Sequence, residues 1–287
     1  MTRVAAIDLG TNATRLLVAD VEDGRMTEIV RRTRITRLGE GVDARRRLLP
    51  VPIARVRNAL TDFRREAEAL GAERALAVAT SAVRDAENGE AFLGEIEWSY
   101  GFATRLLTGD EEAAMTLSGV GPLEYGTVVV DVGGGSTELI TNDFRTSLDL
   151  GCVRLTERHG DDVDAIAADV RSALPALHAR RVLNVDGTTA ELAALAGSRT
   201  VTLAEIDDAL AWVATSTEQE IRARLMEPDR SDVLAAGVVV VRETLRHLGV
   251  AKTTASDRDL LNGIALAAAR LPEPEEGAAP PGAYTCC

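Results

Sequence analysis

This 287-residue chain has almost no lysine, because 31 of its 32 basic side chains are arginine and only Lys252 is lysine. A Walker phosphate-binding loop places a lysine after a glycine-rich turn, whereas Lys252 follows Ala251 and no such turn. The sequence therefore excludes a P-loop NTPase. Any charged phosphate clamp in this protein has to use arginine, whose planar guanidinium matches phosphate oxygens in pairs.

Cysteines, aromatic residues and long apolar runs are also scarce. The three cysteines have no disulfide-framework or zinc-ligand spacing, and two of them, Cys286 and Cys287, end the chain. No apolar run approaches the ~18 residues that a membrane span needs, so we predict a cytoplasmic protein with no membrane partner. Residues 272–287 are rich in proline, glycine, alanine and glutamate, and this composition predicts a disordered tail.

Negative charge predominates and is unevenly spread. The formal net charge is −13. Residues 1–105 carry 17 arginines and 16 acidic residues, so the remaining 15 basic and 29 acidic residues make the rest of the chain strongly acidic. Nucleic-acid-binding proteins are usually basic, so we expect no nucleic-acid partner. A polyanionic ligand requires a local concentration of arginine.

Two segments of the chain are closely alike. Asp8-Leu9-Gly10-Thr11-Asn12 and Asp131-Val132-Gly133-Gly134-Gly135-Ser136-Thr137-Glu138 each follow a short apolar run. Each predicts a buried strand that ends in an acid, followed by a tight turn. Backbone N–H and hydroxyl groups of such turns bind phosphate, and the carboxylate suits Mg²⁺ or Mn²⁺. An aspartate that caps its own turn is the alternative, but the matched pair favours Asp8 and Asp131 as metal ligands.

The elements around these segments repeat. Three strands in a meander, followed by alternating helices and strands, occur in each half, which predicts a duplicated α/β architecture. Apolar periodicity predicts helices over residues 162–180 and 203–226, among others. We place domain I at residues 1–122 and domain II at 123–271, with a hinge at 119–126.

In order and spacing, the motifs resemble those of the exopolyphosphatase and guanosine pentaphosphate phosphohydrolase family, in its short two-domain form. The resemblance implies two duplicated ribonuclease H-like domains, the actin-like ATPase fold, with an interdomain cleft and a homodimeric assembly. The segments that carry it are Ala6 to Leu16, Leu38 to Val42, Ala79 to Asn88, Gly109 to Ala113 and Asp131 to Glu138, followed more weakly by Gly151 to Thr156, Asp186 to Thr188, Arg230 to Val233 and Ser256 to Gly263.

The resemblance also assigns the catalytic acids. Glu112 stands in Asp110-Glu111-Glu112 at a predicted helix start, and by charge alone all three acids would complement the helix dipole. The family pattern selects Glu112 as the base that activates water. It selects Glu138 as a second catalytic acid and, with Asp8 and Asp131, as a ligand of Mg²⁺ or Mn²⁺.

The phosphate-binding residues that we predict lie in turns or follow them. Arg84 is a candidate clamp, with a surface ion pair to Asp85 or Glu87 as the alternative. The arginine clusters of the first third either steer a polyanion or form solvated faces; they are Arg31-Arg32, Arg34, Arg37 and Arg45-Arg46-Arg47. The full predicted set is Gly10, Thr11, Asn12, Arg15, Ser81, Arg84, Gly133, Gly134, Gly135, Ser136, Thr137, Gly187 and Thr188.

Four positions depart from the family pattern: Ala13, Asn184, Asp186 and Asn262. Ala13 removes a hydroxyl from the first turn. Asp186 places a negative charge beside the predicted phosphate site at Gly187, where it would weaken phosphate affinity or recruit a second cation.

The predicted function is an exopolyphosphatase that releases terminal orthophosphate from inorganic polyphosphate. Hydrolysis of guanosine pentaphosphate is the first alternative, because that substrate presents the same anhydride. A kinase of the same superfamily is a further alternative. A regulator that binds polyphosphate or guanosine tetraphosphate without turnover is the last.

Overall fold

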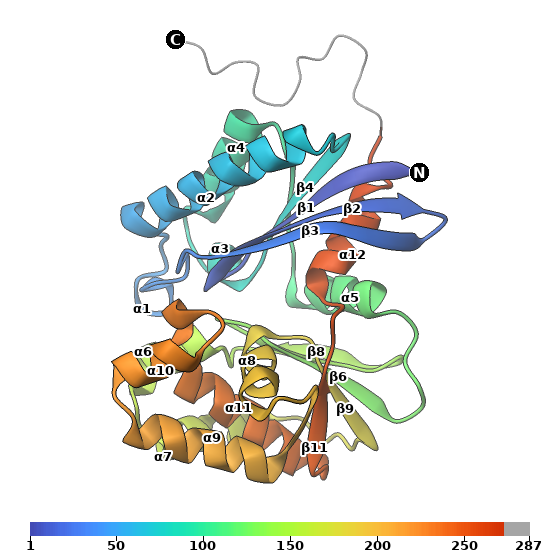
Figure 1. The fold of residues 1–287 in the computed structure, drawn as a ribbon. Helices are drawn as coiled ribbons and strands as arrows, with labels where there is room; N and C mark the ends of the chain where they lie inside the picture. The colour runs from blue at the N-terminus through green and yellow to red at the C-terminus, as the bar shows by residue number, and fades with distance from the viewer. Residues whose placement is uncertain (273–287) are drawn as a thin grey trace. The chain divides into compact units, whose positions relative to one another are not determined.

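The computed structural model describes residues 1–272, and the chain divides into two compact units (Figure 1). Unit 1 comprises Met1–Val120 and the chain from Leu260 onward, and unit 2 comprises Gly121–Asp259. Apart from residue 272, the predicted disordered tail lies outside the described residues. Within residues 1–272, no helix combines the length and the apolar character needed to cross a bilayer.

Unit 1 is built on a five-stranded sheet with the order β3-β2-β1-β4-β5. The first three strands form an antiparallel meander, and β4 and β5 extend it in parallel. The apolar run before Asp8 makes β1 the buried central strand, whereas β3 is an exposed edge strand. The strands are β1 (Thr2–Leu9), β2 (Ala13–Glu22), β3 (Arg25–Ile35), β4 (Arg74–Ala79) and β5 (Ala103–Leu106).

Helices cover both faces of this sheet because β1 is apolar on both of its sides. Ala5 and Ile7 point into the core formed with α2 and α4, while Val4 and Ala6 point into the core formed with α5 and α12. The helices of unit 1 are α1 (Val42–Arg45), α2 (Pro50–Ala69), α3 (Ser81–Arg84), α4 (Gly89–Tyr100), α5 (Gly109–Val120) and α12 (Leu260–Ala268).

Unit 2 repeats the same plan. Its six-stranded sheet has the order β10-β11-β9-β6-β7-β8, in which β6, β7 and β8 form the meander and β9 and β11 are parallel to β6. The prediction of a duplicated ribonuclease H-like α/β fold is thereby confirmed. The strands are β6 (Thr127–Val132), β7 (Thr137–Ile140), β8 (Arg145–Leu148), β9 (Arg181–Asn184), β10 (Thr200–Thr202) and β11 (Lys252–Ala255).

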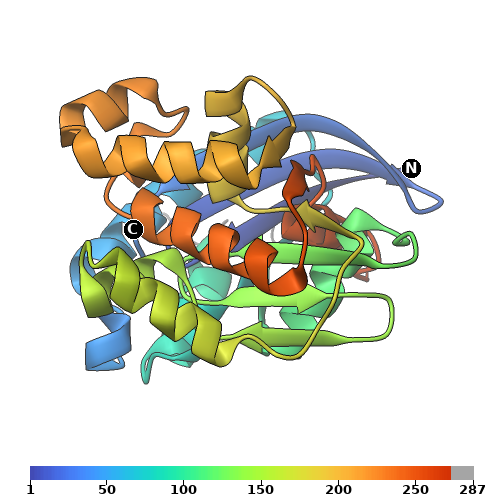
Figure 2. The same ribbon diagram turned by 90° about the horizontal axis from the view of Figure 1, so that it is seen from below.

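The core of unit 2 centres on α11, which lies between α7 and α9 (Figure 2, where α11 is orange-red). Its run Val238 to Val241 is fully buried. The helices of unit 2 are α6 (Cys152–His159), α7 (Val163–Ala173), α8 (Gly187–Ala196), α9 (Leu203–Thr215), α10 (Glu218–Arg224), the 3₁₀ turn η1 (Pro228–Arg230) and α11 (Leu234–Leu248).

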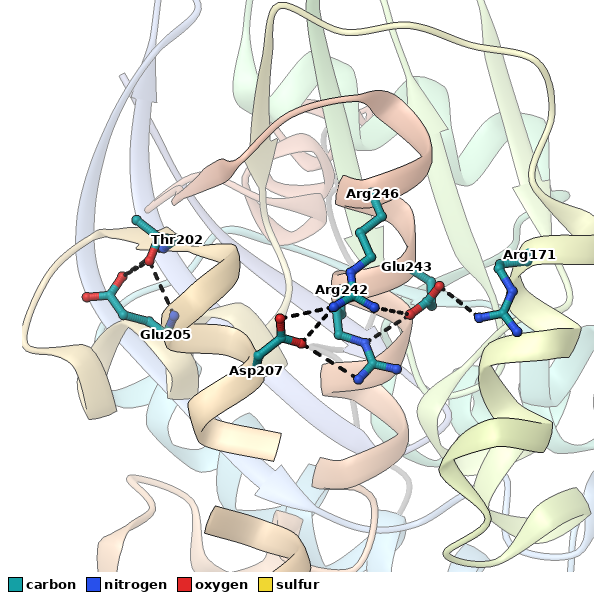
Figure 3. A network of polar contacts seen from close by, with 7 residues as sticks. All are labelled: Arg171, Thr202, Glu205, Asp207, Arg242, Glu243 and Arg246. Carbon is teal, nitrogen blue, oxygen red and sulfur yellow. Dashed lines mark hydrogen bonds and ion pairs between the residues drawn. The ribbon is translucent and has the colours of Figure 1, made fainter. Parts of the chain in front are cut away.

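A polar network joins these three helices (Figure 3). Glu243 on α11 is buried and accepts from Arg171 of α7 at 3.1 Å, from Arg242 at 2.9 Å and from Arg246 at 3.2 Å. Arg246 also donates to Asp207 of α9 at 3.0 Å. A buried carboxylate is tolerated only when it is paired in this way, so the network fixes α7 and α9 against α11.

Three boundaries differ from the sequence prediction. The closing helix α12 packs in unit 1 and not in the predicted domain 123–271, because its apolar face joins the core under β1. Gly263 permits this packing, since a Cβ there would lie 1.9 Å from the Met115 carbonyl oxygen of α5.

The predicted helix 162–180 stops at Ala173, before Pro175. The predicted helix 203–226 breaks because Thr217 forms a capping box that starts α10.

Candidate functional site

The first turn of unit 1 follows directly from the end of β1. Asp8 is buried and lies opposite Arg15 on β2. Arg15 donates to Asp8 Oδ2 from Nε at 2.8 Å and from Nη2 at 2.7 Å. Gly10 closes the turn, and a Cβ there would lie 2.8 Å from the Ala13 carbonyl oxygen. Two predicted residues, the metal ligand Asp8 and the phosphate ligand Arg15, are therefore bound to each other.

Asn12 carries the clearest sign of a polar ligand in this turn. Its side chain is only 5% exposed, and neither its amide nitrogen nor its amide oxygen has a hydrogen-bond partner among the described residues. An unsatisfied buried polar group costs about 1–3 kcal/mol. Its backbone carbonyl, in contrast, accepts from Thr36 and Arg37. A phosphate oxygen would accept a hydrogen bond from the nitrogen of this buried amide.

The structure separates the three acids at the start of α5. Glu111 is exposed and caps the helix by accepting from the Thr108 backbone N–H and hydroxyl, both at 2.9 Å, and the former bond is the main cause that lowers its pKa. Asp110 is exposed as well. Glu112 alone is buried, at 7% exposure. The helix-dipole alternative therefore describes Glu111, whereas Glu112 needs another explanation.

Glu112 faces Arg84, which ends α3. Arg84 Nη1 donates to Glu112 Oε2 at 3.2 Å and to the Leu107 carbonyl at 2.9 Å. Burial raises the pKa of Glu112 to about 7, although Arg84 opposes the rise and the nearby Asp8 adds to it. The alternative of a surface ion pair between Arg84 and its sequence neighbours is wrong. Ser81, the first residue of α3, is buried in the same segment.

In unit 2, two carboxylates occupy neighbouring strands. Asp131 on β6 lies directly opposite Glu138 on β7, and such cross-strand pairs have Cβ atoms ~5 Å apart on one face. Glu138 is 1% exposed and accepts from the Ser147 hydroxyl of β8 at 2.6 Å. Within residues 1–272 no three His, Cys, Asp or Glu side chains form a metal cluster. Mg²⁺, however, is commonly held by one or two carboxylates and completed by water and phosphate, so this oxygen pair fits it.

The triple-glycine turn between these strands is anchored by its carbonyl groups. Gly134 accepts from Val153 at 2.9 Å and from Arg154 at 3.1 Å at the start of α6. Backbone contact there is so close that a Cβ on Gly151 would lie 2.2 Å from Gly134. No residue in the described part of the chain accepts a hydrogen bond from the N–H of Gly134 or Gly135. These two N–H groups are therefore available to an anion.

Two side chains at this turn behave differently from the prediction. Thr137 was expected to bind phosphate, but its hydroxyl donates its one proton to the Leu150 carbonyl. Arg154 was not predicted, yet it is buried and its Nε donates to the Gly135 carbonyl at 2.7 Å. Its sequence context, Cys152-Val153-Arg154-Leu155, gives only the weak signal of an arginine inside an apolar run. Ser136 is buried beside them.

The third predicted turn, after β9, explains two departures from the family pattern. Asp186 caps α8 by accepting from Thr189 N–H at 2.7 Å, and its other oxygen accepts from Asn184 Nδ2 at 2.8 Å. Burial raises the pKa of Asp186. The two unusual residues thus bind each other. The hydroxyl side of Thr188 packs on α11, where a Cβ on Gly237 would lie 2.5 Å from Thr188 Oγ1.

An arginine from a distant part of the sequence covers this turn. Arg230 of η1 lies against Gly187, where a Cβ would be 2.3 Å from Arg230 Nη2. The loop before η1 is held by Glu191 of α8, a buried carboxylate that accepts from the N–H groups of Met226 and Glu227, both at 2.9 Å. The sequence predicts neither the position of Arg230 nor the role of Glu191, because only the folded chain brings η1 to the start of α8.

Asn262, the fourth departure, has a role outside these turns. It accepts from Arg31 Nη2 at 3.1 Å and its Nδ2 lies 3.4 Å from the sulfur of Met26. Because Arg31 and Met26 belong to β3, Asn262 ties α12 to the edge of the sheet of unit 1.

Two sheets of the same plan, each with an acid near the end of its first strand, are typical of the actin-like fold. Comparison with known proteins shows which class of enzyme this is. The family model described as Ppx/GppA phosphatase family matches residues 17–182. Exopolyphosphatase 2 of Mycobacterium tuberculosis is 39% identical over 94% of this chain and 99% of its own length. The crystal structure of an exopolyphosphatase-like protein, 30% identical, superposes with a TM-score of 0.85 over 93% of this chain and 97% of that one.

The chain belongs to the Ppx/GppA phosphatase family. Its membership confirms both the predicted resemblance and the predicted class of enzyme, a phosphohydrolase. A guanosine-5'-triphosphate,3'-diphosphate pyrophosphatase of Vibrio atlanticus is also similar, with 33% identity over 60% of this chain but only 36% of its own length.

Proposed function

We propose that this protein is an exopolyphosphatase that hydrolyses the terminal phosphoanhydride of inorganic polyphosphate. The pair formed by the buried Glu112 and the half-buried Arg84 carries the proposal, because it sets a base with a pKa of about 7 beside a fixed guanidinium. A general base works best when its pKa lies near the working pH. The relative from Mycobacterium tuberculosis, which is named for the same activity, adds support.

In the proposed reaction, Glu112 accepts a proton from a water molecule as the water oxygen bonds to the terminal phosphorus. The bridging P–O bond breaks, and the shortened polyphosphate leaves with the electron pair of that bond. Phosphoryl transfer of this kind depends mainly on positioning and on neutralising charge. Arg84 Nη1 already bonds Glu112 and Leu107, so the rest of its guanidinium is fixed in place to receive phosphoryl oxygens.

Binding of the phosphate groups is assigned to donors that the structure leaves available. These are the buried amide of Asn12 in unit 1 and the N–H groups of Gly134 and Gly135 in unit 2. Arg230, held over Gly187, is a further candidate. Thr137 is a weaker candidate, because its hydroxyl proton is donated to the Leu150 carbonyl.

The proposal includes Mg²⁺, or Mn²⁺, at Asp131 and Glu138, whose paired carboxylates and the Ser147 hydroxyl offer oxygen ligands. When bound, such an ion would neutralise negative charge on the phosphoryl group. Asp8 is the weaker ligand of the three that we predicted, because two nitrogens of Arg15 already compensate its charge. The predicted homodimer and cytoplasmic location stay predictions.

Hydrolysis of guanosine pentaphosphate is the second candidate. The relative from Vibrio atlanticus favours it, but the chain spans only about a third of that protein's length. Membership in a phosphatase family counts against the kinase alternative. A regulator without turnover would not need Glu112 buried against Arg84 with a pKa near neutrality.

The test is orthophosphate release by the purified protein. With Mg²⁺ present, we expect release from long-chain polyphosphate, slower release from guanosine pentaphosphate, and no ADP from ATP. Glu112→Gln serves as the control for contaminating phosphatases and should release little. Faster hydrolysis of guanosine pentaphosphate would support the second candidate, and tight binding of polyphosphate without any release would support the regulator.

A further inference from the structure

An arginine-rich loop, residues 36–48, is fixed at its start to the first turn of unit 1. The N–H groups of Thr36 and Arg37 donate to the Asn12 carbonyl at 3.0 and 2.8 Å, and Gly39 donates to the Thr11 carbonyl at 2.8 Å. Gly39 is needed for this approach, because a Cβ there would lie 2.2 Å from Thr11 Cγ2. The loop therefore starts at the residues to which we assign phosphate binding.

The other end of the same loop is bound to the segment that follows Arg84. The backbone N–H of Glu87 donates to the Arg46 carbonyl at 2.8 Å. Asn88 bonds both backbone groups of Leu48, accepting from its N–H at 2.8 Å and donating to its carbonyl at 3.1 Å. The short helix α1 lies within this loop, and Figure 1 shows it at the same end of the unit as α3. The run Arg45-Arg46-Arg47 is thus held against Glu87 and Asn88, which follow Arg84 by three and four residues.

The charges of this run are not balanced by the fold. Arg46 lies 3.9 Å from Asp85, a long ion pair. The side chains of Arg45 and Arg47 are exposed, and neither guanidinium has an ion pair or a hydrogen bond with any described residue. Two other exposed arginines of the unit do have partners: Arg32 pairs with Glu66 and Arg57 with Glu95. Adjacent like charges in a fixed loop repel each other unless an anion lies between them.

We propose that Arg45 and Arg47 form a distal phosphate subsite, which binds internal phosphates of a polyphosphate chain whose terminal phosphoryl group lies at Arg84 and Glu112. This inference rests on the proposed function and deepens it, because it predicts a preference for long chains. A linear polyanion is the ligand that fits, since consecutive charges along it can meet both guanidiniums at once. A phosphate chain too short to reach the loop would not be affected.

The test compares two variants with equal loss of charge. The first is the double substitution Arg45→Gln and Arg47→Gln. The matched control is Arg25→Gln with Arg65→Gln, because both side chains are exposed in unit 1 and lack partners among the described residues. Arg25 begins β3 at the end of the hairpin away from Asp8, and Arg65 is on α2.

For long-chain polyphosphate, we expect the first variant to raise KM about tenfold with kcat within twofold, and to make log KM less dependent on salt. For tripolyphosphate, its kinetics should match the wild type, and the control should match the wild type on both substrates. Unchanged KM for long chains, or an equal rise for tripolyphosphate or in the control, would overturn the subsite.

Equilibrium binding keeps this test separate from that of the proposed function. In a Glu112→Gln background, long-chain polyphosphate should bind about tenfold more weakly when Arg45 and Arg47 are also replaced. If the wild type hydrolyses no polyphosphate but this difference persists, the proposed activity fails and the subsite stands. If single-stranded RNA competes as well as polyphosphate does, the loop is a general polyanion site and the inference is wrong.

Discussion

Arg84 Nη1 is shared between Glu112 Oε2, at 3.2 Å, and the Leu107 carbonyl, at 2.9 Å. Leu107 stands just before α5, the helix that carries Glu112, so one guanidinium fixes both the acid and the start of its helix. The arginine lowers the pKa of Glu112, but burial acts more strongly and raises it to about 7. The pair therefore combines a base that is active near neutrality with a cation that is held in place.

Replacement of Glu112 by glutamine should remove most of the activity while the protein stays folded. Glutamine keeps the size and can still accept from Arg84, but it cannot take a proton from water. A positioned general base contributes roughly 10²–10⁴-fold in rate, so kcat for phosphate release should fall in that range. Circular dichroism and thermal unfolding of the variant provide the control. Phosphate release at the wild-type rate would rule out Glu112 as the base.

The same substitution should change how stability depends on pH. The pKa of Glu112 rises from its usual 4.5 to about 7 on folding, so the folded protein holds this proton more tightly than the unfolded chain. The contribution of this group to stability is therefore complete below pH 4.5 and is lost as the pH rises towards 7, by ~3 kcal/mol. Glu112→Gln lacks this loss, so it should gain stability relative to the wild type between pH 4.5 and 8. Chemical denaturation at both pH values measures the gain, and a constant difference would contradict the raised pKa.

Substitution of Arg84 should shift the pH dependence of catalysis. Because Arg84 lowers the pKa of Glu112, Arg84→Gln should raise that pKa further. The acid limb of the profile of kcat/KM against pH should then move to higher pH, in addition to any loss of phosphate binding. Arg84→Lys keeps the charge and should shift the limb less. An acid limb at the same pH in all three proteins would show that Arg84 does not act on the base.

Much of this arrangement follows from local sequence. The remaining parts could not be predicted locally, and they share one cause. The apolar runs before Asp8 and Asp131 predicted the two central strands and their turns, because a buried strand followed by a glycine turn is a local signal. The choice of Glu112 over Glu111 was not local, since it depends on which acid Arg84 and the core enclose. The placement of α12 in unit 1 and of Arg230 over Gly187 depends on contacts between residues far apart in the chain. Those contacts leave no periodic pattern.

Asp186 and Asn184 should behave as a coupled pair. Asp186→Asn turns an acceptor into a donor that faces Asn184 Nδ2 or Thr189 N–H, and this should cost roughly 1–3 kcal/mol of stability. Adding Asn184→Asp restores an acceptor opposite a donor and should recover most of the loss. Thermal or chemical unfolding of the two single variants and the double variant gives the coupling energy. Additive effects would show that the hydrogen bond is unimportant.

The same variants decide whether Asp186 opposes phosphate binding. Its carboxylate is occupied by donors from Asn184 and Thr189, so we expect KM for polyphosphate to stay within twofold when Asp186 is replaced by asparagine in the swapped pair. A marked fall in KM would instead support the repulsion that the sequence suggested.

Glu191 should matter for substrate binding although it lies beside the site and not in it. Its carboxylate accepts from the N–H groups of Met226 and Glu227 and so holds the loop that leads to Arg230. Glu191→Gln retains only one acceptor for these two donors, which should cost roughly 1–3 kcal/mol and loosen the loop. We expect KM for polyphosphate to rise several-fold with a smaller change in kcat. Glu205→Gln, which weakens the capping box of α9, is the matched control and should lower stability without altering KM. If Glu191→Gln also alters only stability, Glu191 supports the fold of unit 2 and does not position Arg230.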